Sequence, residues 1–387
     1  MRPARLALVL FSGWIASVGA TACPPAGKPG GPLRGLSPEE LARFEKGRAV
    51  FQRKFTPETG LGPLFNADAC GECHETPATG GTGDEVETHV AAVRPEGACD
   101  PLAAEGGFVI QQHATPALTA ALGIDREPVP SDATAQAGRS TPDLFGFGLL
   151  DAVPEATILA LADPDDRNHD GISGRPNRFL DGRLGRFGRK AFVPTLEEFN
   201  EGAFVIEMGI TSPAVPTEES IGGKPIPAGV DPVPDPEISQ EDVDLANDFV
   251  RFLAPPPPLP LGREGKRGRL IFGTIGCAAC HVPSLMTGDN PVAALRYKHV
   301  EAYTDLLLHD MGAARADICL GLAEPSEFRT EPLMGVRLMT TFLHDGKSKS
   351  IEEAIEMHAG EAQGARDRFG RLSPLERAAL LTFLRSL

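Results

Sequence analysis

The chain has 387 residues, with 53 Asp and Glu against 37 Lys and Arg and a formal net charge of −16. Such an acidic balance argues against nucleic acid as a partner. It suits the attraction of a basic or mixed-charge redox donor protein, although charge alone selects no partner. Aromatic residues are scarce, yet a chain of this length is long enough to build two cores.

The first 36 residues have the pattern of an export signal followed by a tether. Arg2 and Arg5 precede an apolar run and a small-residue cleavage site, so residues 1–22 are predicted to be a signal peptide. The apolar run is too short for a transmembrane helix. Cleavage would leave Cys23 at the start of a flexible tether over 23–36, which is typical of a bacterial lipoprotein. We therefore expect a lipid anchor on the periplasmic side of a membrane; the alternative is a soluble periplasmic or secreted protein.

Residues 37–254 are predicted to form a large N-terminal domain. It opens with Ser37-Pro38-Glu39-Glu40, a capping box with proline at the first helical position. A short amphipathic stretch, 46–51, precedes the pentapeptide Cys70-Gly-Glu-Cys73-His74. In a Cys-x-x-Cys-His motif the two thiols attach a haem and the histidine binds its iron.

Much of residues 75–235 is rich in Gly and Pro, so we expect short helices, long loops and small hairpins there. Asp166, Asn168 and Asp170 supply oxygen ligands at positions 1, 3 and 5 of a loop that resembles a Ca²⁺ loop, but position 12 is Asn177 instead of Glu. The loop is a candidate calcium site. The alternative is a turn held by side-chain-to-backbone hydrogen bonds.

An amphipathic helix predicted over 242–253 ends at the proline-rich segment 255–261, which is expected to be a semi-rigid linker. Residues 262–387 have the length of one small cytochrome c domain. They contain a second motif, Cys277-Ala-Ala-Cys280-His281, and end in a helix that a second capping box opens at Ser373. We therefore predict a mainly α protein with two cytochrome c-like haem domains, the N-terminal one enlarged by long loops and small hairpins.

Two such motifs in an exported chain indicate two covalently bound haem c groups. A structural zinc site needs four ligands, usually in two neighbouring clusters, and neither Cys pair has a second cluster nearby. A thioredoxin-like dithiol would lie in a βαβ pattern, and neither motif does. Cys99 and Cys319 remain. In an oxidising compartment we expect them to pair and to tie the two halves together; the alternative is a reactive redox dithiol.

Seven short segments carry a combined pattern: 148–152, 170–175, 304–312, 331–337, 342–346, 350–355 and 358–362. Together they resemble the bacterial di-haem cytochrome c peroxidase superfamily, and more closely its di-haem oxidoreductase branch, whose members are often called thiol oxidoreductases. The resemblance runs from about residue 37 to the end of the chain.

The resemblance implies two unequal haems. In that superfamily the C-terminal haem takes electrons from a donor and is six-coordinate, and the position of its sixth ligand falls on His358 here. The N-terminal haem meets peroxide, and the position of its displaceable distal histidine falls near His89, with His113 and His309 as alternatives. His344 is expected to hydrogen-bond a haem propionate or to set a turn.

The same superfamily places an acid/base glutamate in a Glu-Met-Gly segment, which matches Glu207-Met208-Gly209. Glu207 is therefore the candidate that moves a proton during peroxide reduction; the alternative is a capping or salt-bridging carboxylate. Two positions depart from the pattern. The companion glutamine falls on Phe199, and the inter-haem tryptophan is missing, because the single Trp is Trp14 in the signal peptide.

The sequence thus favours an exported di-haem oxidoreductase that takes electrons at the C-terminal haem and reduces peroxide or a similar oxidant at the N-terminal haem. The alternatives are a non-enzymatic electron-transfer cytochrome and an oxidase of an organic or protein substrate on the same scaffold.

Overall fold

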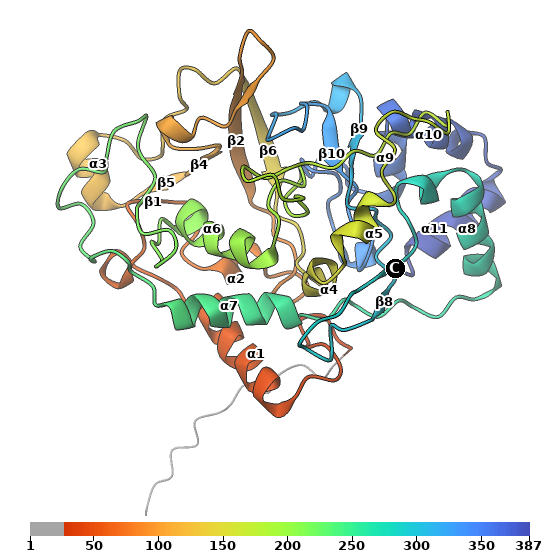
Figure 1. Ribbon diagram of the computed structural model, residues 1–387, viewed down its shortest axis with the longest axis horizontal. Helices are drawn as coiled ribbons and strands as arrows, with labels where there is room; N and C mark the ends of the chain where they lie inside the picture. Colours follow the sequence, from red (N-terminus) through yellow and green to blue (C-terminus); the bar gives the residue numbers. More distant parts are fainter. Residues whose placement is uncertain (1–26) are drawn as a thin grey trace, which may run out of the picture.

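The structure, a computed structural model, describes residues 27–387, so the predicted signal peptide and Cys23 lie outside the described residues (Figure 1). The helices are α1 (Pro38–Phe51), α2 (Cys70–Cys73), α3 (Pro116–Leu122), α4 (Phe147–Asp151), α5 (Glu155–Leu159), α6 (Leu196–Met208), α7 (Gln240–Phe252), α8 (Arg263–Thr274), α9 (Ile351–Glu356), α10 (Gln363–Gly370) and α11 (Pro374–Leu384). The strands are β1 (Leu64–Phe65), β2 (Val86–Val93), β3 (Cys99–Asp100), β4 (Val109–Ile110), β5 (His113–Ala114), β6 (Ala135–Ser140), β7 (Leu285–Met286), β8 (His299–Val300), β9 (Leu308–Asp310) and β10 (Glu327–Arg329). No helix among these residues is long and apolar enough to cross a membrane.

Capping boxes begin the first and the last helix. At α1, Glu40 N donates to Ser37 Oγ (3.2 Å) and Ser37 N donates to Glu40 Oε2 (2.7 Å). Ser373 and Glu376 form the same reciprocal pair at α11. Both predicted capping boxes are therefore confirmed.

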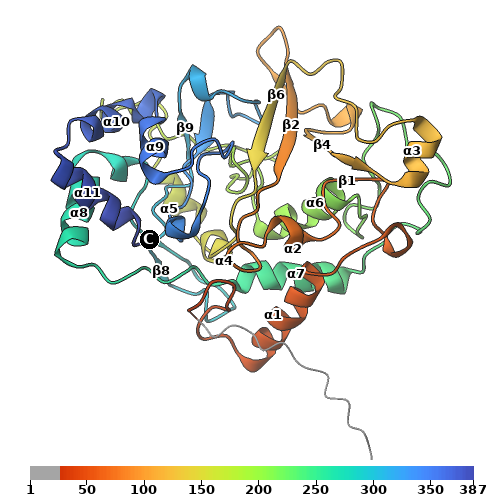
Figure 2. The same cartoon turned by 180° about the vertical axis from the view of Figure 1, so that it is seen from behind.

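Two helix pairs cross at a glycine. α1 packs on α7, the helix predicted over 242–253, and a Cβ on Gly47 would lie 1.9 Å from Leu245 O. α8 packs on α11, and a Cβ on Gly268 would lie 2.0 Å from Ala379 O. A larger residue would therefore clash with the backbone of the partner helix. In both cartoon views the α8–α11 pair lies at one end of the molecule, away from α1 and α7 (Figures 1 and 2).

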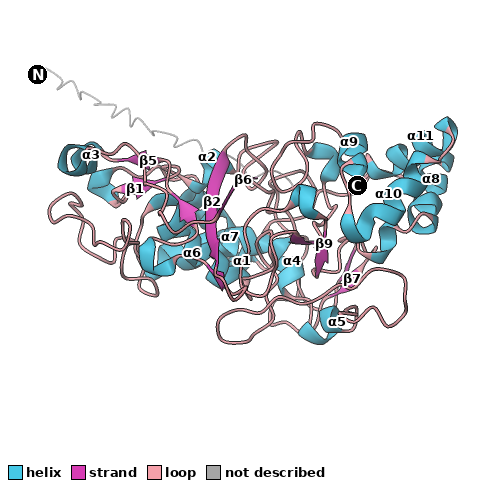
Figure 3. Ribbon diagram, turned by 90° about the horizontal axis from the view of Figure 1, so that it is seen from above, coloured by secondary structure: helices cyan, strands magenta, loops and turns pink. Residues whose placement is uncertain are grey.

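A sheet around β2 lies in the middle of the molecule, with α3 at one end and α8, α10 and α11 at the other (Figure 3). β2 pairs antiparallel with β6, with Val86 opposite Ser140, and also with β3 and β4. The region 75–235 thus contains a longer sheet than the small hairpins that the sequence predicts. The β6 sequence, Ala-Gln-Ala-Gly-Arg-Ser, has no β-branched or aromatic residue, so its pairing depends on tertiary contacts and not on intrinsic propensity.

One apolar cluster joins the two predicted domains. Its buried members come from both sides of the proline-rich segment 255–261, including Phe249 before it and Leu306 after it. The division into 37–254 and 262–387 stays a prediction. Residues before and after the proline-rich segment share one apolar core.

The described part of the predicted tether, 23–36, is packed and not flexible. Leu33 N donates to Phe252 O (2.8 Å) and Ala254 N donates to Gly31 O (2.9 Å), which binds this segment to the end of α7. Residues 30–33 are buried there. Backbone pairing and burial therefore outweigh the flexibility that the Gly and Pro content suggests.

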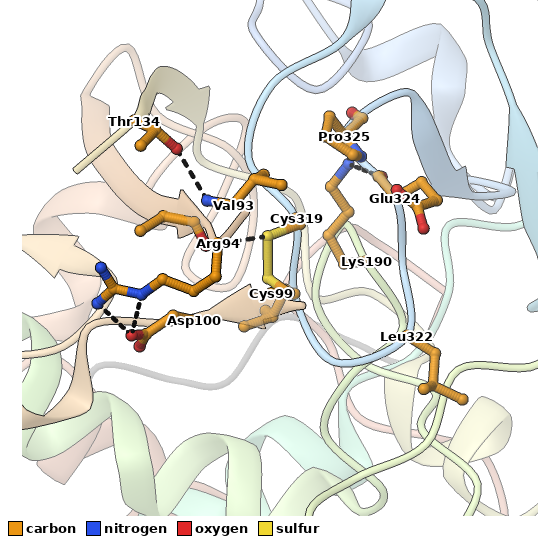
Figure 4. The surroundings of a disulfide bond; sticks show 12 residues. Val93, Arg94, Cys99, Asp100, Thr134, Lys190, Cys319, Leu322, Glu324 and Pro325 are labelled. Atoms are coloured by element: carbon orange, nitrogen blue, oxygen red, sulfur yellow. Dashed lines mark hydrogen bonds and ion pairs between the residues drawn. A yellow bond between two sulfur atoms is a disulfide. The ribbon is translucent and has the colours of Figure 1, made fainter. Parts of the chain in front are cut away.

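Cys99 and Cys319 form a disulfide with 5.7 Å between their Cα atoms, so the predicted pairing is confirmed (Figure 4). Close to it in the chain, Asp317 Oδ2 accepts a hydrogen bond from Arg139 Nη2 (2.7 Å). Asp317 Oδ1 also forms an ion pair with Lys190 Nζ (2.8 Å). The C-terminal part is thus attached to the central sheet region both covalently and by buried charges.

Candidate haem sites

A cavity of about 460 Å³ lies beside the second Cys-x-x-Cys-His motif. Cys277 begins a short 3-10 turn after α8, and it lines the cavity together with Cys280 and His281. Apolar side chains from α8, α9 and α11 line it as well: Phe272, Ile351, Ile355 and Leu384. A large, mainly apolar cofactor suits a cavity of this size and lining.

Two histidines face each other at this cavity. The ring centroids of His281 and His358 are 6.5 Å apart, close to the roughly 6 Å expected when two imidazole nitrogens each bind one metal ion at about 2 Å. His281 Nδ1 donates to Tyr303 O (2.9 Å) and His358 Nδ1 donates to Ala354 O (2.7 Å), which leaves Nε2 of each ring for a metal. Burial lowers the pKa of His281 to about 4 and also lowers the pKa of His358, so both rings are in the neutral form that binds metals.

The first motif has similar surroundings. Cys70 and Cys73 bound α2, and His74 Nδ1 donates to Gly81 O (3.0 Å), which again leaves Nε2 for a metal. The Phe51 ring at the end of α1 lies 6.0 Å from the His74 ring. At the second motif, the Phe272 ring of α8 lies 6.4 Å from the His281 ring, which matches the arrangement at the first motif.

The four motif cysteine side chains are half-buried, and burial raises the thiol pKa of three of them. Burial raises the pKa of Cys70 and of Cys277 to about 12, and it raises the pKa of Cys73 as well. A reactive dithiol needs a lowered thiol pKa. The raised thiol pKa values, present in each pair, therefore do not support a thioredoxin-like role for either one.

Glu207 lies in the last turn of α6, beside the first motif. Its carboxyl group is close enough to Cys70 and Cys73 to act electrostatically on both thiols. Burial, assisted by the charge of Glu87, raises the pKa of Glu207 well above its ordinary value. The protonated form therefore persists above the pH at which an ordinary glutamate ionises, and a protonated carboxyl group can donate a proton to a bound oxidant.

His89 lies in β2 and not in a polar loop. It is 7% exposed, its Nε2 is 3.1 Å from Glu87 Oε2, and its ring packs on Phe108. The carboxylate engages one of the two nitrogens that could bind a metal, so the distal-ligand role of His89 stays a prediction. The alternative His113 lies exposed in β5.

His309, a further alternative for that role, lies at the second motif and not at the first. Its Nε2 is 2.8 Å from Asp305 Oδ2, its Nδ1 is 2.6 Å from Glu361 Oε2, and Cys280 Sγ is 3.5 Å from Nδ1. Burial opposes a charge on this ring, but its hydrogen bonds outweigh burial and raise the pKa of His309 well above its ordinary value. Since both nitrogens are occupied at the other site, His309 is wrong as a distal ligand of the first haem.

His344 lines the second cavity and lies in a turn. Its ring stacks on Phe328, with centroids 4.1 Å apart, and Lys190 Nζ lies 3.8 Å from the centre of the Phe328 ring. The His344 carbonyl accepts a hydrogen bond from Ser140 N (3.0 Å), at the end of β6. Burial lowers the pKa of His344 to about 4, so the ring is neutral.

Three arginines that sequence reasoning missed line the same cavity. Arg189 Nη1 and Arg329 Nη2 both lie against Glu331 Oε2 (3.0 and 2.8 Å), and Arg315 is 3.8 Å from Asp345. Within residues 27–387, buried nitrogens of Arg189 and Arg329 lack a hydrogen-bond partner. A ligand with carboxylate groups, as haem has, fits these donors. The three residues are far apart in the chain, so no local motif signals them.

The candidate calcium loop is closed by its own backbone. Asp170 N donates to Asp166 Oδ1 and to Asn168 Oδ1 (both 3.0 Å), and Ile172 N donates to Asp170 Oδ1 (2.9 Å). This is the turn that the sequence left as the alternative. No group of three or more His, Cys, Asp or Glu placed to hold a metal ion occurs in the described part of the chain. Calcium binding stays a prediction.

Phe199 has an apolar role where the sequence pattern expected a companion glutamine for Glu207. Its ring packs on Phe187, with centroids 6.3 Å apart, at the edge of the main apolar cluster. The amide that does contact Glu207 belongs to Asn66, whose Nδ2 donates to Glu207 Oε2 (2.8 Å). Asn66 lies shortly before Cys70 and is 141 residues from Glu207 in the chain.

A family model described as "Di-haem oxidoreductase, putative peroxidase" matches residues 129–387. This match covers more than half of the sequence, and the chain belongs to that family. The protein is therefore a haem-containing oxidoreductase of a peroxidase-like class. A search of curated protein sequences finds no match.

Solved structures give further similarities of low identity. Hydrazine synthase from Kuenenia stuttgartiensis is 12% identical, with 100% of both chains covered and a TM-score of 0.43. A MauG-like protein associated with microbial copper homeostasis is 17% identical over 97% of this chain and 95% of that chain, with a TM-score of 0.42. The diheme peroxidase BthA from Burkholderia thailandensis is 18% identical over 91% of this chain and 86% of that chain, with a TM-score of 0.43.

Proposed function

We propose that this protein is an exported di-haem c-type oxidoreductase in which electrons enter at the second site and reduce peroxide, or a similar small oxidant, at the first. The inequality of the two sites carries the proposal. At the second site the His281 and His358 rings lie 6.5 Å apart, and each engages a backbone carbonyl through Nδ1, which leaves both Nε2 atoms for one iron. At the first site His74 is accompanied by the half-buried acid Glu207, whose pKa is raised.

The cysteines of each motif would hold one haem through two thioether bonds, and His74 and His281 would bind the irons. Haem iron supplies the redox chemistry at both sites. The unpartnered arginine nitrogens and the apolar walls of the second cavity support this fit.

The second site is suited to electron exchange and not to reaction with an oxidant. Two histidine ligands leave no open position on an iron, and an imidazole in place of a thioether ligand lowers its reduction potential. Ala354, whose carbonyl accepts from His358, belongs to α9, so the histidine is held by a helix end and not by a free loop. The acidic balance of the chain favours a basic or mixed-charge donor protein.

The first site needs a group that moves protons, because reduction of a peroxide to water consumes protons as well as electrons. Glu207 lies half-buried near Cys70 and Cys73, and its raised pKa keeps a proton available there. General acid/base catalysis by one positioned carboxyl group contributes typically about 10²–10⁴-fold to a rate.

Low-temperature EPR of the ferric protein, before and after hydrogen peroxide is added, tests the proposal. We expect one low-spin signal that His358→Met alters, and a second signal that is high-spin or becomes so and that alone responds to peroxide. His89→Ala shows whether His89 contributes to that second signal, and His113→Ala, a change of an exposed histidine, is the control. Two low-spin signals, both inert to peroxide, would instead support the electron-transfer cytochrome.

Export and lipid anchoring are part of the proposal and rest on the sequence of residues 1–23. We expect Cys23→Ser to move the protein from the membrane fraction to the soluble periplasmic fraction. Retention in the membrane fraction would contradict an anchor at Cys23.

A further inference from the structure

The side chain of Asn66 joins three segments at the first site. Asn66 Nδ2 donates to Glu207 Oε2 (2.8 Å), and Asn66 Oδ1 accepts from the backbone N–H of Gln112 (3.0 Å). The backbone N–H of Asn66 also donates to the backbone carbonyl of Glu207 (2.7 Å). Asn66 therefore contacts both the backbone and the carboxyl group of the candidate acid.

These contacts fix the orientation of the Asn66 amide. A backbone N–H can only donate, so the atom that faces Gln112 must be the amide oxygen. The amide nitrogen must then face Glu207, where it can only donate. The carboxyl oxygen Oε2 is consequently held as an acceptor, and a proton on Glu207 belongs on Oε1, which makes no hydrogen bond to any residue of the described chain.

A close backbone approach places Asn66 beside α6. Gly209 follows the helix with a φ of +63°, and a Cβ on it would lie 2.5 Å from Leu64 O. A Cβ on Gly62 would lie 2.2 Å from Gly209 O. Only glycines allow the segment 62–66 to lie this close to the helix end. Gly209, the glycine of the Glu-Met-Gly segment, therefore allows the close approach that brings Asn66 to Glu207.

We propose that Asn66 is a positioning residue for Glu207, which fixes the carboxyl group with Oε2 as an acceptor and Oε1 as the oxygen that exchanges a proton at the first site. This inference rests on the proposed function of Glu207. Asn66 itself is not placed against the reacting atoms; it acts through the carboxyl group.

The charges around Glu207 give the inference a measurable consequence. Glu87 of β2 raises the pKa of Glu207 in addition to burial, and Glu207 in turn raises the pKa values of Glu219, Cys70 and Cys73. The hydrogen bond from Asn66 acts in the opposite direction and lowers the pKa of Glu207, because a donated hydrogen bond stabilises the carboxylate. Loss of the Asn66 side chain should therefore raise this pKa further.

The test is pH-difference infrared spectroscopy of the ferric holoprotein, with the Glu207 carboxyl band identified by its loss in Glu207→Gln. In Asn66→Ala we expect the midpoint of that band to move upward by roughly one pH unit, the shift that corresponds to one hydrogen bond to a charged group. Gln112→Ala is the matched control, since it keeps the backbone N–H that holds Asn66 and removes only the side-chain bond to Val86 O. We expect this control to leave the midpoint unchanged.

The same variants separate this inference from the proposed function. If the Glu207 midpoint is the same in Asn66→Ala as in the unmodified protein, the positioning role is wrong. If the midpoint moves and the pH midpoint of the reaction with hydrogen peroxide moves with it, both proposals are supported. If the Glu207 midpoint moves while Glu207→Gln leaves the peroxide reaction unchanged, Asn66 still positions Glu207, and the acid/base role of Glu207 is wrong.

Discussion

Two carboxylates each form ion pairs with two basic side chains. Asp317 is a partner of both Arg139 and Lys190, and Glu331 is a partner of both Arg189 and Arg329. Lys190 is fully buried, and burial lowers its pKa to about 8, while Asp317 acts to keep it charged. Removing one shared carboxylate therefore breaks the ion pairs of two cations at once.

Asp317→Asn should destabilise the protein strongly, because it takes the paired carboxylate from two buried cations, Arg139 and Lys190, at once. We expect a loss of about 3–5 kcal/mol in the free energy of unfolding, measured by urea denaturation. The control is Asp181→Asn, which breaks an exposed ion pair with Arg183 and should cost less than about 1 kcal/mol. Equal losses in the two variants would contradict a special role for the buried pairs.

The His309 network should make stability depend on pH. The folded pKa of His309 is raised, so the stabilisation from its charge is fully present below its unfolded pKa of about 6.5 and is lost as the pH rises through the folded value. The pKa of its partner Glu361 is lowered, so that stabilisation is lost only at acid pH. We expect His309→Gln to be most destabilising near pH 6 and progressively less so at alkaline pH, as measured by denaturant unfolding across pH. A destabilisation that does not vary with pH would mean that the ring packs but carries no charge.

At the scale of elements, each haem motif follows a helix that another helix crosses at a glycine. α1 and α8 occupy equivalent positions before the two motifs, and α7 and α11 are their partners. The crossing holds the phenylalanine of each helix close to the motif histidine. Each helix crossing therefore brings an aromatic ring against the histidine of one Cys-x-x-Cys-His motif.

Gly268→Ala should separate α8 from α11. The added methyl group would lie 2.0 Å from Ala379 O, so the backbones must move apart, at a cost of about 3 kcal/mol. Gly273→Ala in the same helix is the matched control, because a Cβ there meets nothing within 4 Å and alanine favours a helix by about 1 kcal/mol. Thermal unfolding should show a lower midpoint for the first variant and an equal or higher one for the second. A fall of similar size in both would contradict the close crossing.

Local sequence patterns predicted the parts of this fold that depend on local chemistry. The capping boxes at Ser37 and Ser373 and the helix before the proline-rich segment are signals of that kind, and all three were found. The pairing of Cys99 with Cys319 followed from compartment chemistry and from the number of cysteines that remained. β6 could not be predicted, because its partner β2 supplies the reason for its extended conformation.

The candidate sites divide in the same way. The motif histidines and His358 could be proposed from the sequence, and the structure brings His281 and His358 together. The environment of His89 could not be predicted from the sequence, because the formation of the sheet buries this side chain and places it beside Glu87. Asn66 and the cavity arginines gave no signal, because the fold and not a local motif brings these residues to their sites.

At the scale of the molecule, the two predicted domains are joined by a shared core, a buried ionic cluster and the Cys99–Cys319 disulfide. The disulfide closes a sequence separation of 220 residues. Cross-links of this kind stabilise mainly by restricting the unfolded chain. They also limit how far the two halves can move apart in the folded protein.

The double variant Cys99→Ala/Cys319→Ala should unfold at a lower urea concentration, with a loss of about 2–5 kcal/mol. EPR of its two haem signals should be unchanged, because neither cysteine lines the cavity beside the second motif, and His74 and His281 hydrogen-bond to Gly81 and Tyr303. A changed signal at either iron would show that the cross-link also shapes a haem site.

The disulfide has a topological consequence. The backbone from 99 to 319 and the sulfur–sulfur bond form one covalent ring, and the proline-rich segment 255–261 lies within it. A protease cut engineered into that segment would therefore open the ring without releasing either half: one band on a non-reducing gel and two after reduction. The first motif, at 70–74, and His358 lie outside this ring, so a change in oxidation state would require rearrangement within a closed loop only of the segments between 99 and 319, while the disulfide keeps the two halves joined.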